Sequence, residues 1–134
     1  AAAQNMVPTS TGAAIATTKV VPELENKFDG IAVRVPTITG SLVDFSLVLK
    51  KDVTAEEVNN ALREASKTYL KGILDVTDEP LVSSDFIGNS FSSTADMGMT
   101  KVVGGNLVKI ISWYDNEWGY ANRLVEMVEI IGQS

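Results

Sequence analysis

Polar and aromatic residues cluster at one predicted strand-to-helix corner, residues 113–120, which read WYDNEWGY. The segment before it is apolar and β-branched, and apolar residues recur at helical spacing after it. The carboxamide of Asn116 both donates and accepts hydrogen bonds, so it can complement a second carboxamide. Asp115 and Asn116 also stand where a helix N-cap is expected. The corner therefore predicts either a ligand-binding group at a strand end or an ordinary helix cap.

Thr11 and Gly12 are candidates for binding an anion. They stand at the first turn of a predicted helix, where backbone N–H groups lack intrahelical partners and the helix dipole favours negative charge. Gly12 lets a phosphate approach the backbone closely, and the Thr11 hydroxyl adds a donor. From spacing alone, a plain helix cap is an equally good interpretation.

Arg34 is a second anion candidate, because it is the one charged residue in the apolar segment 30–37. Burying a guanidinium is costly unless it is paired or reaches an open cleft. Its planar fork matches the oxygens of a phosphate. The alternatives are a buried ion pair with Asp44 on the next strand, or an outward orientation from a sheet edge.

Local signals predict the elements that position these residues. A helix is expected over residues 11–24, with Pro22 at its end, and a strand over residues 31–35. A second strand, within residues 41–49, lacks clean alternation, so we expect both of its faces to be covered. Thr54 and Glu57 predict a capping box. The helix that follows has an apolar face made of Val58, Ala61, Leu62, Ala65 and Tyr69.

The second half of the chain predicts mainly strands. They are expected over residues 80–85, 92–97, 101–103 and 107–113, with a hairpin turn at 104–106 and a final helix after the corner. The expected fold class is α+β, an antiparallel-rich mixed sheet covered by helices. With no repeat or linker, residues 1–134 are expected to be one domain or part of one.

Composition excludes several classes of function. A formal charge of −6 without a basic cluster argues against a nucleic-acid partner. The chain has no Cys and no His, which excludes disulfides, thiolate metal sites and the common nucleophile–base pairs within it. No apolar run reaches the roughly 18 residues of a membrane helix. The acidic turn of Asp75, Asp78 and Glu79 has too few oxygens for a metal loop, and Asp96 is expected to be a structural acceptor.

Residues 8–14 (PTSTGAA), 30–37 and 113–120, in this order and spacing, resemble the glyceraldehyde-3-phosphate dehydrogenase family. The resemblance runs over all 134 residues and covers only the C-terminal part of that family's catalytic domain. It implies that Thr11 and Gly12 match phosphate-site positions and that Arg34 matches the substrate-phosphate arginine. It further implies that Asn116 holds the nicotinamide carboxamide and that Tyr120 packs near the ring, with Glu117 in support.

The same resemblance implies a cytoplasmic, homotetrameric enzyme that oxidises glyceraldehyde 3-phosphate with NAD and inorganic phosphate. The family's nucleotide-binding domain, catalytic Cys and His partner lie upstream of the matching part. We therefore expect residues 1–134 to be a partial catalytic domain with no catalytic residue, inactive alone. The alternatives are an erythrose-4-phosphate dehydrogenase, or a noncatalytic half-domain that acts in binding or assembly.

Overall fold

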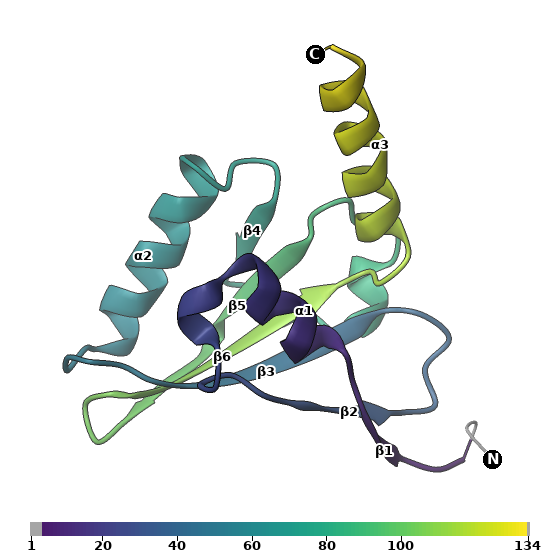
Figure 1. Cartoon of the computed structure of the whole chain (residues 1–134). Coiled ribbons are helices and arrows are strands. Elements are labelled where there is room, and N and C mark those ends of the chain that lie inside the picture. Colours follow the sequence, from purple (N-terminus) through teal and green to yellow (C-terminus); the bar gives the residue numbers. More distant parts are fainter. Residues whose placement is uncertain (1–3, 134) are drawn as a thin grey trace. The chain divides into compact units, whose positions relative to one another are not determined.

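The computed structural model describes residues 4–133, and the chain divides into two units, Ala1–Ile38 and Thr39–Ser134. In the first unit, β1 (Val7–Ser10) pairs antiparallel with β2 (Ile31–Arg34). Helix α1 (Ala13–Val20) and a 3-10 turn, η1 (Pro22–Leu24), lie between these strands in the sequence (Figure 1).

Helix α1 is shorter than the helix predicted over residues 11–24. Val21 leaves the helical region, with φ −122° and ψ 81°. Pro22 has no N–H to donate and cannot extend the helical hydrogen bonds. The prediction that the helix ends near Pro22 is therefore correct. The last turn of the predicted helix, Pro22–Leu24, is instead the separate 3-10 turn η1.

The second unit is built on a four-stranded sheet with the order β3-β6-β5-β4 (Figure 1). The central strand β6 (Leu107–Tyr114) pairs antiparallel with β3 (Ser41–Val48) and with β5 (Ser93–Val103). Strand β4 (Leu74–Thr77) joins β5 in parallel. These pairings confirm the predicted α+β class with an antiparallel-rich mixed sheet.

Helix α2 (Ala55–Lys67) lies against β4 and β5, and the core forms between them. Its buried members are Ala65, Leu74, Ala95 and Met97. The capping box is confirmed: Thr54 Oγ1 accepts from Glu57 N at 3.1 Å, and Glu57 Oε2 accepts from Thr54 N at 2.7 Å. Thr54's backbone and side-chain hydrogen bonds lower the pKa of the Glu57 carboxyl.

The predicted packing faces of two elements need correction. On α2, Ala61 and Tyr69 do not join the buried face; Tyr69, just beyond the helix, is 80% exposed. On β3, burial alternates from residue to residue instead of covering both faces. Leu42 and Val48 lie on the outer face and are 45% and 78% exposed. β3 is an edge strand that pairs antiparallel with β6, and one-sided burial is common in such strands.

The strand predicted over residues 80–85 is wrong. Residues Ser83–Phe86 form a 3-10 turn, η2, in which Asp85 Oδ2 accepts from Val82 N at 2.8 Å. Pro80 has no N–H for a strand ladder, and the Asp85 carboxylate occupies the N–H of Val82. The strand that pairs beside β5 is instead β4, which the sequence did not predict.

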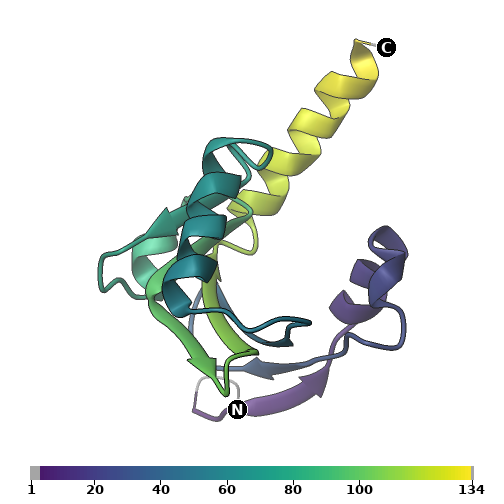
Figure 2. The same cartoon turned by 90° about the vertical axis from the view of Figure 1, so that its left-hand side faces the viewer.

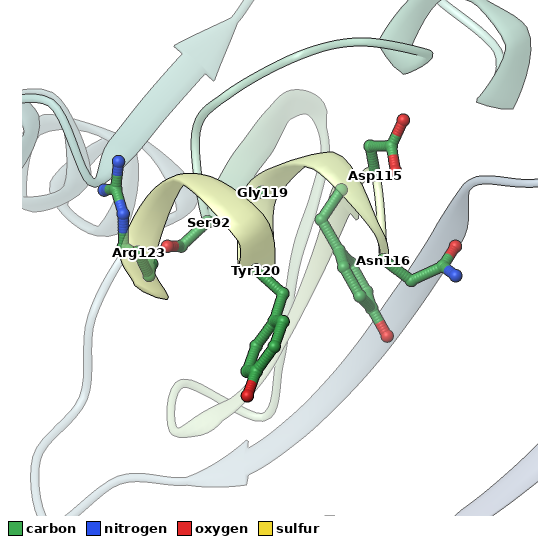
Figure 3. Close-up of a pocket in the computed structure, with 7 residues that line it drawn as sticks. Ser92, Asp115, Asn116, Gly119, Tyr120 and Arg123 are labelled. Atoms are coloured by element: carbon green, nitrogen blue, oxygen red, sulfur yellow. The ribbon is translucent and has the colours of Figure 1, made fainter. Parts of the chain in front are cut away.

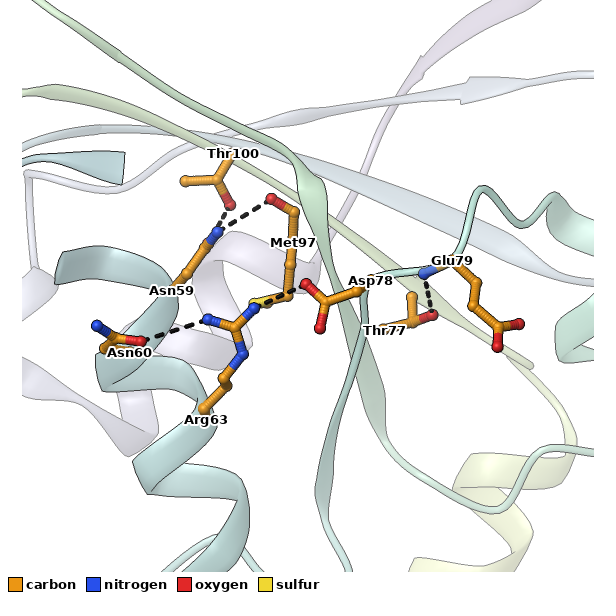
Figure 4. Close-up of polar contacts among 8 residues, drawn as sticks. All are labelled: Asn59, Asn60, Arg63, Thr77, Asp78, Glu79, Met97 and Thr100. Carbon is orange, nitrogen blue, oxygen red and sulfur yellow. Dashed lines mark hydrogen bonds and ion pairs between the residues drawn. The ribbon is translucent and has the colours of Figure 1, made fainter. Parts of the chain in front are cut away.

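Two predicted strands, 92–97 and 101–103, form one continuous strand, β5, whose register shifts between Asp96 and Lys101. The irregular part is held by Asn59 of α2 (Figure 4). Asn59 Nδ2 donates to the carbonyl oxygen of Met97 at 3.0 Å, and its Oδ1 accepts from Thr100 Oγ1 at 2.7 Å. The predicted break in the strand is thus an irregularity within it.

Helix α3 (Trp118–Gly132) follows β6, as expected. Figures 1 and 2 both show that the C-terminal end of α3 projects away from the four-stranded sheet. Its expected apolar stripe is solvent-exposed at Leu124, Val125, Val128 and Ile131. Among residues 4–133, none of the helices combines the length and apolarity that a membrane span needs.

Candidate functional site

Asp115 fixes the corner where β6 ends and α3 begins. Its side chain is buried, with 5% of the residue exposed. Oδ1 accepts from the backbone N–H groups of Glu117 and Trp118 at 2.9 and 2.8 Å. Oδ2 accepts from the backbone N–H of Gly88 at 2.9 Å. Of the two residues predicted as the helix cap, Asp115 therefore supplies the capping oxygen, and it also holds the turn at Gly88.

These hydrogen bonds also set the charge of the site. The backbone N–H of Gly88, followed by that of Trp118, lowers the pKa of the Asp115 carboxyl, and the N–H of Glu117 adds a smaller effect. Burial opposes the shift but does not reverse it. Asp115 is therefore ionised at neutral pH, and its negative charge is stabilised by the three backbone N–H groups of the corner.

Asn116 points in a different direction from Asp115 and is exposed (Figure 3). Its Oδ1 accepts from Gly40 N at 3.1 Å and from Ser41 Oγ at 3.3 Å. Antiparallel pairing brings these residues together, because Ser41 at the start of β3 is opposite Tyr114 at the end of β6. Asn116 is thus held by the neighbouring strand and does not cap α3.

An open pocket of about 320 Å³ lies beside this corner (Figure 3). Asn116 and Tyr120, the two residues predicted to bind one ligand group, both line it, and Tyr120 is 70% exposed. Glu117, predicted in support, is not among its lining residues. The complete lining is Ser92, Tyr114, Asp115, Asn116, Gly119, Tyr120 and Arg123.

Ser92 and Arg123 are pocket residues that the sequence analysis missed. Arg123 Nη1 donates to the carbonyl oxygen of Gly72 at 3.0 Å, and Nη2 donates to Glu126 Oε1 at 2.6 Å. Its buried Nε has no hydrogen-bond partner among the described residues. Its helix also carries Glu126 and Glu129, so the argument from an isolated charge that applied to Arg34 could not have identified Arg123. Ser92 carries no such signal either.

Gly119 allows α3 to approach the Phe91–Ser92 segment. A Cβ at this position would lie 2.9 Å from the carbonyl oxygen of Phe91. Gly119→Ala is therefore expected to destabilise the protein by about 1 to 2 kcal/mol, because backbone rather than a flexible side chain must move. Gly132→Ala is the matched control, since a Cβ at that end of α3 meets nothing within 4 Å. The melting temperatures of the two variants are measured in the full-length protein. If Gly119→Ala melts at the same temperature as Gly132→Ala, the close approach at Gly119 is contradicted.

The anion candidates of the first unit lie at the start of α1. Thr11 Oγ1 accepts from Ala13 N at 3.1 Å, so Thr11 does act as a local cap. Gly12 is the N-cap residue, and a Cβ there would meet no atom within 4 Å. The helix start is therefore open enough for a ligand to reach its N–H groups, and the cap and ligand roles are compatible.

Arg34 ends β2 and is exposed. It is opposite Val7, whereas Ser10, next to Thr11, is opposite Ile31. The backbones of Arg34 and Thr11 thus lie at opposite ends of this strand pair, separated by more than about 10 Å of strand. The structure does not bring the backbone of Arg34 beside Thr11 and Gly12, so a shared ligand depends on the reach of the arginine side chain.

Asp44, the predicted alternative partner of Arg34, lies beside another cation. Asp44 pairs with Lys109, with 2.7 Å between Oδ2 and Nζ, and no ion pair among residues 4–133 includes Arg34. Asp44 thus has a cationic partner within its own unit, and Arg34 at the end of β2 is exposed. An exposed guanidinium at a strand end agrees with the outward orientation and leaves its fork accessible to an anion.

The remaining acidic candidates have structural contacts. Asp78 of the acidic turn pairs with Arg63 of α2 at 2.7 Å (Figure 4). Asp96 is buried, and its Oδ2 accepts from Trp113 Nε1 at 3.2 Å, which confirms its predicted role as a structural acceptor. Neither residue belongs to the pocket.

Comparison with known proteins gives matches over the whole chain. The family model described as "Glyceraldehyde 3-phosphate dehydrogenase, C-terminal domain" matches residues 1–116. Glyceraldehyde-3-phosphate dehydrogenase 2 of Synechocystis sp. is 54% identical over 134 residues, covering 100% of this chain and 40% of the relative. The Priestia megaterium enzyme is 57% identical over 131 residues, with 98% and 39% covered. The chloroplastic GAPA1 enzyme of Arabidopsis thaliana is 53% identical, with 100% and 34% covered.

Proposed function

This chain belongs to the glyceraldehyde 3-phosphate dehydrogenase family, and on that premise we propose that it supplies phosphate-binding and nicotinamide-binding residues to a phosphorylating, NAD-dependent enzyme. The reaction oxidises glyceraldehyde 3-phosphate and yields an acyl phosphate from inorganic phosphate. The observation that carries the proposal is that Asn116, in the turn between β6 and α3, and Tyr120, in the first turn of α3, line one pocket. NAD preference, a cytoplasmic location and homotetrameric assembly belong to the same proposal and rest on family membership.

The catalytic nucleophile and base lie outside this chain in the proposed enzyme. Residues 1–134 contain no Cys and no His, and the chain spans between 34% and 40% of the relatives compared above. The chain's contribution is therefore to bind and orient. By itself it is expected to show no dehydrogenase activity.

The pocket residues fit a nicotinamide ring, which accepts a hydride when NAD is bound. Asn116 has an amide that can hydrogen-bond the ring carboxamide, and this bond fixes which ring face meets the aldehyde carbon. The exposed ring of Tyr120 offers a flat apolar surface beside it. Asp115 maintains the corner backbone from which Asn116 extends.

The first unit supplies the groups proposed to bind phosphate. Thr11 Oγ1 accepts one hydrogen bond from Ala13 N and retains its own hydrogen to donate. Open space at Gly12 leaves the N–H groups at the start of α1 accessible to an anion. Arg34 adds a bidentate fork with a full positive charge. This charge stabilises the negative oxygens as phosphate attacks the acyl carbon.

The test of the cofactor role is Asn116→Ala in the full-length enzyme. We expect kcat/KM for NAD to fall by about tenfold, the effect of one well-oriented hydrogen bond. The melting temperature should fall only modestly: the variant loses the bonds from Gly40 N and Ser41 Oγ, but Asp115 still caps α3. Steady-state kinetics and a thermal melt on the same preparation separate the two quantities.

Two results would argue against this function. A sharp fall in melting temperature with normal kinetics per folded molecule would make Asn116 a structural residue. Faster turnover of erythrose 4-phosphate than of glyceraldehyde 3-phosphate would favour the tetrose phosphate as substrate.

A further inference from the structure

The orientation of the Asn116 amide is determined by the group opposite it. The backbone N–H of Gly40, 3.1 Å from Oδ1, can only donate a hydrogen bond, so the amide atom that faces it must be the oxygen. The Ser41 hydroxyl donates to the same oxygen at 3.3 Å. Rotating the amide by half a turn would place Nδ2 against the Gly40 N–H, and two donors would then face one another.

This orientation leaves the other end of the amide available to a ligand. Within the part of the chain that the structure describes, the Asn116 hydrogen bonds are those received by Oδ1. Nδ2 therefore has its hydrogens to donate, while the lone pairs of Oδ1 are already used. Toward a ligand, Asn116 acts mainly as a donor.

We propose that Gly40 and Ser41 are positioning residues, which turn the Asn116 amide so that Nδ2 donates to the carbonyl oxygen of the cofactor's carboxamide. The inference rests on the proposed function of Asn116 and adds which atoms form the bond and what orients them. Neither positioning residue needs to touch the cofactor.

The backbone around Gly40 suits this role. Its φ of +88° lies in the left-handed region that favours glycine, and a Cβ there would lie 3.2 Å from the carbonyl oxygen of Ser83. Ser41 opposite Tyr114 is the first pair of the β3–β6 ladder. The direction of the Gly40 N–H is therefore fixed by the sheet end, and the Asn116 backbone is fixed by Asp115.

The first experiment measures equilibrium binding of two cofactors by calorimetry to full-length wild-type enzyme and Asn116→Ala. The cofactors are NAD and 3-acetylpyridine adenine dinucleotide, which keeps the carbonyl oxygen and lacks the carboxamide NH₂. We expect Asn116→Ala to raise both Kd values by the same factor, because the bond goes to the shared oxygen. Asn116→Asp is a second variant: it keeps both bonds received by Oδ1, loses the donor, and should also weaken both cofactors.

The second experiment tests the positioning role. Ser41→Ala should raise the Kd of both cofactors about two- to tenfold, the range for loss of one neutral hydrogen bond. Ser41→Thr, which keeps the hydroxyl, should restore binding. Ser46→Ala is the matched control, because Ser46 is an exposed serine on the same strand and lies outside the pocket.

Each failure has a distinct meaning. If Asn116→Ala weakens NAD and leaves the acetylpyridine analogue unaffected, Asn116 accepts from the NH₂ group, which overturns the inference and preserves the proposed function. If Ser41→Ala binds like Ser46→Ala, the positioning role is overturned. If neither Asn116 variant changes the Kd of either cofactor, the proposed cofactor role of Asn116 itself fails.

Discussion

Arg34→Lys in the full-length enzyme is expected to weaken phosphate-dependent turnover by about 1 to 3 kcal/mol, or about 5- to 150-fold. Lysine keeps the positive charge but replaces the planar fork with a single ammonium group, so a bidentate contact with phosphate oxygens is lost. Because Arg34 is exposed and has no ion pair among the described residues, the change should leave the stability of the fold nearly unaltered.

Titration of turnover with inorganic phosphate, and in parallel with arsenate, measures this effect. Arg63→Lys is the matched control: Arg63 forms a surface pair with Asp78 and lies outside the candidate site. That variant should alter neither the phosphate nor the arsenate dependence. An unchanged phosphate dependence in Arg34→Lys would remove Arg34 from the phosphate site.

Asp115→Ala is expected to cost about 2 to 4 kcal/mol of folding free energy, because backbone N–H groups at a buried corner lose their acceptor. Asp115→Asn should cost less. Its Oδ1 can still accept from Glu117 and Trp118, but its NH₂ group would face the N–H of Gly88. Asp44→Asn is the control, since the exposed Asp44–Lys109 pair is worth at most about 1 kcal/mol.

The loss of stability in Asp115→Asn should also depend on pH. The folded-state pKa of Asp115 is lowered, so the ionised carboxylate stabilises the fold above the unfolded pKa of about 4. That contribution is lost as the pH falls from about 4 through the folded pKa. The difference between wild type and Asp115→Asn should therefore shrink in this acidic range. Urea titrations at pH 7 and below pH 4, followed by tryptophan fluorescence, test it; a difference independent of pH would contradict the role of the charge.

Local signals predicted the parts of the fold whose partners lie nearby in sequence. The Thr54–Glu57 capping box joins residues 3 positions apart, and both of its hydrogen bonds form. The strand-to-helix corner was also identified, since an apolar, β-branched run gives way to helical spacing within a few residues. The prediction for residues 80–85 was wrong because their apolar content indicated a strand. In the structure, the Asp85 side chain instead accepts a hydrogen bond from Val82 N and stabilises a 3-10 turn.

Contacts over long sequence separations could not be predicted. Nothing in the sequence near Asp115 indicates that Gly88, 27 positions away, donates to it. The same holds for Ser41 and Asn116, which the strand register alone brings together. The periodic stripe on α3 correctly predicted a helix, but such a stripe does not specify which surface packs against it.

The separation of 76 positions between Gly40 and Asn116 has a kinetic consequence. A chain segment of this length must close before Gly40 can meet Asn116, whereas the first turn of α2 forms from residues that are neighbours in sequence. During refolding, helical signal should therefore return before cofactor affinity. Unfolding should follow the opposite order, because among residues 39–133 the edge strand β3 pairs with β6 alone. Fraying of that one strand would release Asn116 while α2, β4 and β5 remained folded, so the site can fail at denaturant concentrations where the core survives.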